Sequence, residues 1–513
     1  MMSIPTVRRF PAWLRTIAWF IFLLWLLAAC VSPLWWRFTK RAQARAQAIV
    51  ATVPRPISGN TGDNGVYPVH FRPLGESGPE IERGTPVREL PVVGPLLDGD
   101  AATIEKLKRE RDNLSEFLKW IGKCRVDGKI DFKQLLGHLG IQGVEGLSDK
   151  DAAAEFLRWA RSASLLADDW KKALETGTWD FTGVDLLKPC SPEIGESIQV
   201  MLGRFGTQMQ SLWGAMAEAS WQTGDADSAF RHWKFMMVNA ERTGDATSML
   251  GALVESSQRS KAVHTLETGL SVGGFTDAQL AQLIAHLADF SALDSMRRGL
   301  DGEKRIQESL FARIGTSDDP LTFRWVNPFN KPSLNFLNKL AMSLVTPQQI
   351  ADNLAVAQAS TDAALSRFDP ISGNLIPPGS TEVVESAAFG VGDSWFDRFY
   401  FMYSMPPLGN SGIAKRLEAT VVDGQSSMDQ ARLAVALESH RRSTGSFPES
   451  IESVTWHFPD GLPRDLATGE PYHYTRLDDG SYRLWGLGID QTDQGGDPDK
   501  DVVWGQGIKP RQE

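Results

Sequence analysis

Five aspartates lie close together near the end of this 513-residue chain, in the run GIDQTDQGGDPDKDVV. They are Asp490, Asp493, Asp497, Asp499 and Asp501. Only Lys500 offsets them, and carboxylates this close repel one another unless a cation neutralises them. Ca²⁺ suits such a run because it takes oxygen ligands at about 2.3 to 2.6 Å. Gly495 and Gly496 allow the backbone to fold back and present carbonyl oxygens. The run therefore indicates a calcium site or, equally, a solvated acidic turn at a domain edge.

The run does not follow the EF-hand pattern. The segment from Asp497 to Asp501 starts that pattern, but Val502 stands in place of the required glycine. Ile508 stands in place of the bidentate glutamate. A cation bound here therefore needs a different arrangement of ligands.

The residues before the acidic run predict a helix followed by a hairpin. Apolar residues at helical spacing run from Leu433 to Leu437, and Gly445 is a helix stop signal. Two aromatic-rich runs, 472–474 and 482–485, flank the turn residues 478–480. Residues 426–513 are therefore expected to form a small α+β domain with an antiparallel sheet.

Three pieces of this region resemble the globular domain of the major pseudopilin of type II secretion systems. They are ALESHRRSTGSFPESIESV, LPRDLATGEPYHY and GSYRLWGLGIDQTDQGGDPDKDVV, and they lie within residues 429–503. In that family the final loop binds calcium through aspartate side chains and backbone carbonyls. The resemblance implies Leu487 as a carbonyl ligand together with Asp490 and one or more of Asp497, Asp499 and Asp501.

The N-terminal part of the chain departs from the pseudopilin pattern. Pseudopilins carry a prepilin cleavage site with a glutamate just inside the apolar helix, and that helix leads directly into the globular domain. Here residues 17–36 contain no acid, and residues 37–428 separate them from the matching region. We therefore do not expect this chain to polymerise into a pseudopilus.

Residues 1–48 are expected to be a basic N-terminus and a membrane anchor. Residues 16–36 contain no charged residue and are long enough to cross a hydrocarbon core of roughly 30 Å as a helix. The run Leu27-Ala28-Ala29-Cys30 also fits a lipobox, although the chain stays apolar through Trp36. A buried core helix is a third alternative. Basic residues on both sides leave the orientation nearly tied. The pseudopilin resemblance places the bulk of the chain outside the cytoplasm, in the periplasm.

The charge balance argues against nucleic-acid binding. The chain has 53 basic and 63 acidic residues. Its first fifty residues hold seven basic residues and no acid, so the remainder has a balance of -17. A nucleic-acid partner needs a basic face. We therefore expect no nucleic-acid partner, and no pattern in the chain predicts a small-molecule substrate.

Three regions are expected between the anchor and the terminal domain. Residues 49–98 are rich in Pro and Gly and indicate a semi-rigid linker. Residues 99–316 indicate an antiparallel helical body that resembles tetratricopeptide (TPR) repeats without their regular period. Residues 317–425 are irregular, partly helical and rich in aromatic residues. After its first helix, the body is expected to contain helices at 149–175, 191–222, 226–242, 245–256, 260–270, 276–289 and 292–314. The irregular region is expected to contain helices at 333–343 and 347–367.

Catalytic patterns are few. Gly269-Leu270-Ser271-Val272-Gly273 matches the nucleophile-elbow pattern, with His440 and His457 downstream. That elbow needs a strand before the serine, whereas the residues before Ser271 predict a helix. The pair Cys124 and Cys190 forms a disulfide or stays as two buried thiols.

The sequence therefore predicts a mainly α, membrane-anchored envelope protein. We expect a non-enzymatic scaffold or protein-binding module with a calcium-binding terminal domain, related to secretion or pilus-like assemblies. The alternative is an envelope hydrolase that uses a cleft between the helical body and the terminal domain. The whole chain also resembles membrane-anchored proteins of planctomycete- and verrucomicrobia-type bacteria that end in the same kind of domain.

Overall fold

The computed structural model describes most of the chain from residue 85 to residue 505. The described ranges are 85–126, 129–181, 198–245, 248–288, 290–313, 347–376 without 366, 370 and 371, and 411–505, with a few positions between 37 and 47. The expected anchor, the lipobox cysteine, most of the linker, Cys190, helix 333–343 and the aromatic stretch 383–405 lie outside these residues. No helix in the described ranges is long and apolar enough to cross a membrane.

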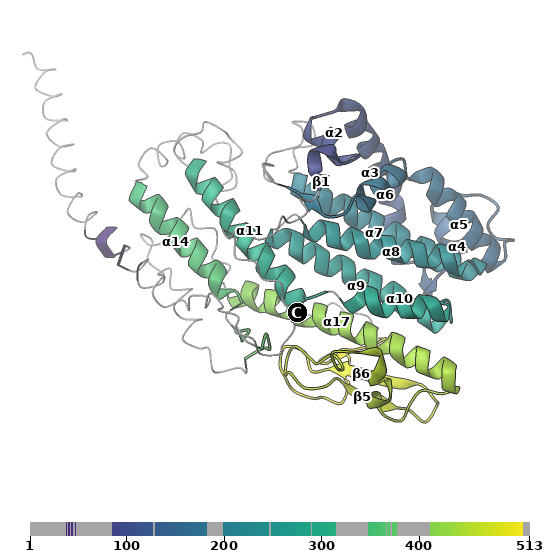
Figure 1. Cartoon of the computed structure of the whole chain (residues 1–513). Helices are drawn as coiled ribbons and strands as arrows, with labels where there is room; N and C mark the ends of the chain where they lie inside the picture. Colours follow the sequence, from purple (N-terminus) through teal and green to yellow (C-terminus); the bar gives the residue numbers. More distant parts are fainter. Residues whose placement is uncertain are drawn as a thin grey trace, which may run out of the picture. The chain divides into compact units, whose positions relative to one another are not determined.

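The described residues are mainly helical, with a small three-stranded antiparallel sheet near the C-terminus (Figure 1). This confirms the predicted fold class at that level. The N-terminal elements are β1 (Thr85–Pro86), η1 (Val87–Glu89), α2 (Val93–Leu97), α3 (Ala101–Ile121), β2 (Arg125–Val126), β3 (Lys129–Ile130), α4 (Phe132–His138), α5 (Asp149–Ala163), α6 (Ala167–Glu175) and β4 (Trp179–Asp180). The later ones are α7 (Ile198–Thr223), α8 (Ala226–Gly244), α9 (Met249–Ser271), α10 (Asp277–Ala288), α11 (Ala292–Arg313), α14 (Pro347–Ala363), α17 (Ser411–Thr444), η3 (Ile451–His457), β5 (His473–Arg476), β6 (Tyr482–Gly486) and β7 (Val502–Val503).

The chain divides into two compact units, and each is described by itself. In the smaller unit, the last residues of α11 pair with α14. Gln307 Nε2 donates to Thr361 Oγ1 at 3.3 Å, and Gln358 Nε2 donates to Glu308 Oε1 at 2.8 Å. The other unit contains α2 to α10, most of α11, residues 364–376, and the chain from α17 to β7.

The core of the larger unit forms around α7, α8 and α9, which lie side by side in Figure 1. Trp213 of α7 and Trp233 of α8 are fully buried in it. The joint between these two helices was predicted from Gly224-Asp225. Asp225 caps α8 by accepting a hydrogen bond from the Ser228 N–H at 2.9 Å, which satisfies one of the free donors at a helix start.

Two predicted helix boundaries in the body differ from the structure. Helix 149–175 is in fact α5 and α6, because buried Glu110 accepts hydrogen bonds from Ser164 Oγ and the Leu166 N–H between them. Helices 245–256 and 260–270 are a single helix, α9. Gln258 and Arg259, which lie between the two predicted helices, are both buried. The Gln258 carbonyl accepts a hydrogen bond from Gln210 Nε2, and Arg259 Nε donates to Glu255 Oε1.

A neutral polar cluster holds the register of these helices. Asn239 of α8 is fully buried, and its Oδ1 accepts a hydrogen bond from Trp170 Nε1 at 2.9 Å. Its Nδ2 lies 3.0 to 3.1 Å from the oxygens of Gly206, Gln210 and Gln258. Every polar atom of this amide therefore has a partner, which removes the penalty for burying it.

Residues 85–98, expected within the linker, are instead packed on the helical body. Val87, Leu90 and Val93 are at most 1% exposed and belong to the main core. β1 pairs in parallel with β4, so Thr85 lies opposite Trp179. The proline-rich composition concealed this packing, because Pro86, Pro91 and Pro95 interrupt any helical or strand period of the apolar residues.

Helix α17 belongs to two cores at once. Met428, Ala431 and Val435 are buried in the main core, whereas Leu433 and Leu437 are buried against the terminal sheet. In Figure 1, α17 accordingly runs between α9 and the strands β5 and β6. The expected domain boundary at residue 426 therefore falls inside a continuous helix, and the terminal region shares this helix with the body.

The terminal sheet has the order β5-β6-β7 and is antiparallel throughout. The predicted hairpin is confirmed, with His473 opposite Trp485 and Gly480 at a φ of 83° in the turn. α17 ends before Gly445, as predicted, and the glycine N–H donates to the Arg441 carbonyl at 2.7 Å. β7 contributes only two residues, and it follows directly after the acidic run.

Candidate cation site in the acidic loop

The acidic run forms a loop between β6 and β7, which we call the acidic loop (residues 487–501). Gly495 and Gly496 adopt φ values of 72° and 75°, a left-handed backbone that favours glycine. The predicted reversal of the backbone is therefore present. It turns the end of the loop back toward β6, where Arg483 Nη1 donates to the Gly495 carbonyl at 3.2 Å.

Asp501 is the one aspartate of the loop that is buried, with 6% of its surface exposed. Its Oδ2 accepts hydrogen bonds from the N–H groups of Gly496 and Asp497 at 2.8 and 3.1 Å. Its Oδ1 has no hydrogen-bond partner among the described residues. Burial raises the pKa of this carboxyl in spite of the backbone N–H groups of Gly496, Asp497 and Gln494, which favour its charged form. A buried carboxylate oxygen without a donor is costly, and a cation would remove that cost.

The other predicted aspartate ligands are more open and hold the loop backbone. Asp490 accepts hydrogen bonds from the Thr492 N–H and from Gln494 Nε2. Asp497 Oδ1 accepts the N–H of exposed Asp499 at 3.1 Å. These contacts are local turns of the type that aspartate forms readily, and they leave lone pairs on each carboxylate.

Asp493 braces the loop against the sheet. Its Oδ1 accepts hydrogen bonds from Trp485 Nε1 at 3.1 Å and from the Gly495 N–H at 2.8 Å. These donors hold the pKa of Asp493 below its ordinary value. Its Oδ2 lies 3.7 Å from Nδ1 of His473, and the His473 ring stacks on Trp485. Of the predicted ligands, Asp493 is thus the one most occupied by side chains of the sheet.

Leu487, predicted as a carbonyl ligand, is held at the start of the loop by a residue that the sequence did not single out. Its N–H donates to Oδ2 of Asp465 at 2.8 Å, and Oδ1 of Asp465 accepts from the Ala467 N–H at 3.0 Å. Asp465 is only 2% exposed. It lies in the run LPRDLATGEPYHY, and the resemblance of that run to the pseudopilin domain could have pointed to this aspartate.

Gln491 ties the acidic loop to residues 364–376. Its backbone has a φ of 56°, unusual for a residue other than glycine. Its Nε2 donates to the carbonyls of Leu375 and Ala467 at 2.8 and 2.5 Å. These two hydrogen bonds offset the backbone strain and fix the middle of the loop.

The predicted ligand set therefore stays a prediction. Within the described ranges, no three acidic or histidine side chains converge as a ready-made metal cage. What the loop offers is one buried carboxylate oxygen, the backbone carbonyls of the loop and more exposed carboxylates. This donor set contains only oxygen, which fits a hard cation such as Ca²⁺ better than a transition metal.

The nucleophile-elbow pattern does not have the surroundings that an elbow requires. Ser271 is the last residue of α9, so a helix precedes it where a strand is needed. Its hydroxyl donates to the Thr268 carbonyl at 2.8 Å, a contact within the same helix.

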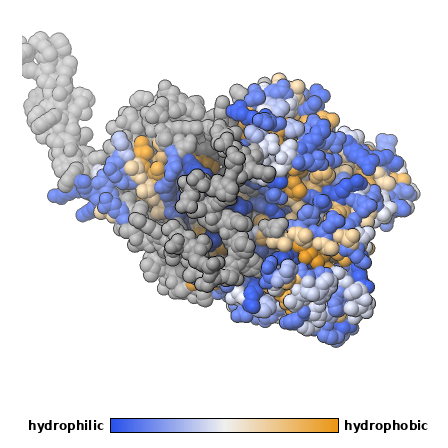
Figure 2. All heavy atoms as spheres, viewed as in Figure 1, coloured by the Kyte–Doolittle hydropathy of each residue, from blue (hydrophilic) through white to orange (hydrophobic). Residues whose placement is uncertain are grey.

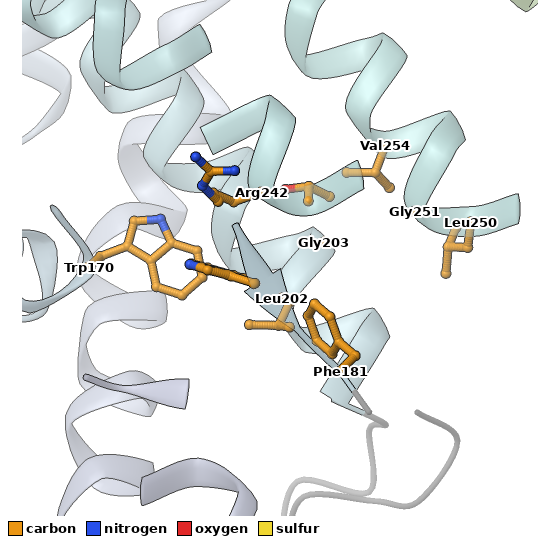
Figure 3. Close-up of a pocket in the computed structure, with 10 residues that line it drawn as sticks. Trp170, Phe181, Leu202, Gly203, Arg242, Leu250, Gly251 and Val254 are labelled. Carbon is orange, nitrogen blue, oxygen red and sulfur yellow. The ribbon is translucent and has the colours of Figure 1, made fainter. Parts of the chain in front are cut away.

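A crevice on the helical body is the other candidate site (Figure 3). It has an empty volume of about 320 Å³, which includes its open mouth. Its lining residues are Trp170, Trp179, Phe181, Leu202, Gly203, Arg242, Thr243, Leu250, Gly251 and Val254. Arg242 forms ion pairs with Asp245 and Glu241, and Asp245 Oδ2 also accepts the Trp179 N–H at 2.9 Å. The one charged lining group is thus already balanced, and the crevice presents mainly apolar walls.

Cys124 is a free, buried thiol. Burial raises its pKa, so it remains protonated and packs as a small apolar side chain in the main core.

Comparisons with known proteins add no family. No family model, no curated protein and no solved structure matches this chain.

Proposed function

We propose that this chain is a membrane-anchored, non-enzymatic envelope protein whose terminal region binds Ca²⁺ in the acidic loop. The helical body serves as a scaffold or protein-binding module. The anchor in residues 16–36 and the periplasmic location belong to the proposal as the sequence predicts them. So does the likeness of the terminal region to the pseudopilin domain, with a secretion or pilus-like assembly as the expected setting.

Asp501 carries the calcium proposal. It combines near-complete burial, two backbone donors on one oxygen and no described partner for the other. Because Ca²⁺ accepts backbone carbonyls, waters and carboxylates in flexible geometry, one buried carboxylate can anchor it without a full cage of side chains. Leu487 and the four other predicted aspartates supply further oxygens along the same loop.

The terminal fold supports the pseudopilin likeness in outline. A long helix packs on a short antiparallel sheet, and the acidic loop joins the last two strands. The function in this proposal is binding because the serine pattern lies at a helix end and the body crevice presents no free charge.

The test is a calcium titration of the full chain in detergent micelles, followed by calorimetry, with Mg²⁺ in a parallel titration. We expect saturable Ca²⁺ binding and much weaker Mg²⁺ binding. Asp501→Asn should weaken the Ca²⁺ affinity at least about tenfold, because it removes the buried anionic oxygen. Asp478→Asn is the matched control, since it makes the same change at an exposed aspartate outside the loop.

Two results would overturn the proposal. One is a folded protein that shows no heat of binding at millimolar Ca²⁺. The other is equal Ca²⁺ affinity in the Asp501→Asn and Asp478→Asn variants, which would make the acidic loop a solvated turn.

A further inference from the structure

The acidic loop is connected directly to the contact between the terminal sheet and the helical body. Asp501, the buried carboxylate of the loop, immediately precedes β7. The Val502 carbonyl accepts a hydrogen bond from Gln430 Nε2 of α17 at 2.7 Å. The Gly505 N–H, just after β7, donates to Glu267 Oε1 of α9 at 3.2 Å. Val502, which contacts α17, therefore directly follows the buried carboxylate. Only three residues separate that carboxylate from Gly505, which contacts α9.

Trp504 lies between these two hydrogen bonds and packs against both hydrophobic cores. Its N–H donates to the Leu484 carbonyl at 2.9 Å, which keeps the chain beside β6 after β7 ends. β7 itself pairs with β6 at only two positions, Val502 with Gly486 and Val503 with Trp485. So short an edge strand depends on its two ends for its position.

From these contacts we propose that cation binding in the acidic loop seats β7 and Trp504 on α9, so that the ion regulates how the terminal sheet is held against the helical body. The inference rests on the proposed calcium site. The physical link is Asp501. Without a cation, its buried and unpartnered oxygen disfavours the closed loop, and β7 is the next segment of the chain. With a cation, the closed loop fixes the start of β7.

The contact between α17 and the body does not pass through the acidic loop. Near the middle of the helix, Gln425 Oε1 accepts the Ala292 N–H at 2.9 Å. Near its C-terminal end, Arg442 Nη1 donates to the Phe275 carbonyl at 2.5 Å, and Arg442 also forms an ion pair with Asp277. Cation removal should therefore loosen β7 and Trp504 and leave α17 in place.

The first measurement is hydrogen exchange with mass spectrometry on the full chain, with saturating Ca²⁺ and with a chelator. We expect the chelator to raise exchange at least about fivefold in peptides that cover 498–505. Exchange in peptides that cover 428–437 of α17 should stay unchanged. Equal exchange in 498–505 under both conditions would overturn the inference, and so would an equal increase in 428–437.

The second measurement uses the reciprocity of coupled binding, since weaker seating of β7 must also weaken Ca²⁺ affinity. Glu267→Ala removes the acceptor on α9 and should raise the Kd for Ca²⁺ about fivefold. Glu267→Gln keeps an acceptor for the Gly505 N–H and should restore most of the affinity. Glu175→Ala, an exposed residue of α6, changes the net charge equally and should leave the Kd unchanged.

The outcomes separate the two proposals. If wild-type protein binds no Ca²⁺, the proposed function itself fails. If it binds Ca²⁺ but Glu267→Ala has the wild-type Kd, the site stands and the coupling to α9 is wrong. If Glu267→Gln loses as much affinity as Glu267→Ala, the effect is a long-range charge effect, which also overturns the coupling.

Discussion

The cluster around Asn239 in the helical body and the loop around Asp501 both bury polar groups, but they do so in opposite ways. Asn239 is a neutral amide whose oxygen and nitrogen both have partners from α6, α7 and α9. Asp501 is a carboxylate that has donors on one oxygen and no described partner on the other. The Asn239 amide is fully paired as the chain folds. In the proposed function, a bound cation pairs with the second oxygen of Asp501.

This difference separates a structural polar group from a binding group. A fully paired buried amide fixes which helix faces meet, because another register would leave the amide and its partners unpaired. A buried oxygen without a partner in a loop rich in aspartate is the feature on which the proposed cation site rests. Asp245 is an intermediate case, since it is a partly buried carboxylate of the body that is paired with Arg242. Variants at these three positions therefore test the comparison.

The largest effect should come from the body. Asn239→Leu leaves Trp170 Nε1 and the amides of Gln210 and Gln258 without their shared partner, and should lower the free energy of unfolding by about 3 kcal/mol. Urea unfolding followed by circular dichroism measures this loss, which should be the same with and without Ca²⁺. Arg231→Ala, at an exposed position of the same helix, should change the stability by less than about 0.5 kcal/mol. A loss below about 1 kcal/mol for Asn239→Leu would mean that the cluster does not hold the register.

The next largest effect is a pH dependence of the free energy of unfolding, caused by Asp245. Burial raises the pKa of this carboxyl from 3.8 to about 6. The folded state therefore holds its proton more tightly than the unfolded state. The stability from this group is fully present below pH 3.8 and is lost as the pH rises through 6. Between pH 7.5 and pH 4.5, wild type should gain about 2 kcal/mol relative to Asp245→Asn.

Asn at position 245 can still accept the Trp179 N–H, so the variant should fold and isolate the titration. Other titrating groups, such as buried His232, are common to both proteins and cancel in the difference. If the difference in free energy of unfolding between wild type and Asp245→Asn stays constant over this pH range, the pKa of Asp245 is not raised.

The smallest difference in stability between a variant and wild type, and the one that most sharpens the comparison, is at Asp501. Without Ca²⁺, Asp501→Asn should raise the free energy of unfolding by about 1 kcal/mol, because it removes an uncompensated buried charge. With Ca²⁺ at about 100 times its Kd, wild type should gain about 2.7 kcal/mol and become the more stable protein. Thermal unfolding of both proteins in chelator and in Ca²⁺ would show whether the order of their stabilities reverses. Equal stability of both proteins in each condition would place Asp501 with the structural groups.

The sequence predicted those parts of the fold that depend on short-range signals. Gly445 and the Gly224-Asp225 joint were read correctly because a helix end is decided by a few neighbouring residues. The hairpin was read correctly because turn residues lie between two aromatic runs. The glycines of the acidic loop were also placed correctly, since a reversal of the backbone is a local property.

The parts that the sequence did not reveal depend on contacts between distant residues. α9 was predicted as two helices, whereas the structure has one, in which buried Gln258 pairs with Gln210 of α7 and Asn239 of α8. Asp465 and Gln491 support the loop through backbone groups far away in the chain, which no spacing rule predicts. Similarly, composition could not distinguish buried Asp501 from its exposed neighbours, because burial is decided by how the loop folds onto β6.

The double burial of α17 has a consequence for how this protein is made. The main core needs Met428, Ala431 and Val435, which leave the ribosome after every helix from α2 to α11. Domains begin to fold as the chain emerges from its N-terminal end. During synthesis, the apolar side chains of the body that later pack against α17 are therefore exposed to solvent, in what we call the apolar groove. Completion of the body and assembly of the terminal sheet become one late event. A chain truncated anywhere before residue 435 would keep the groove exposed and be a natural target for chaperones and proteases.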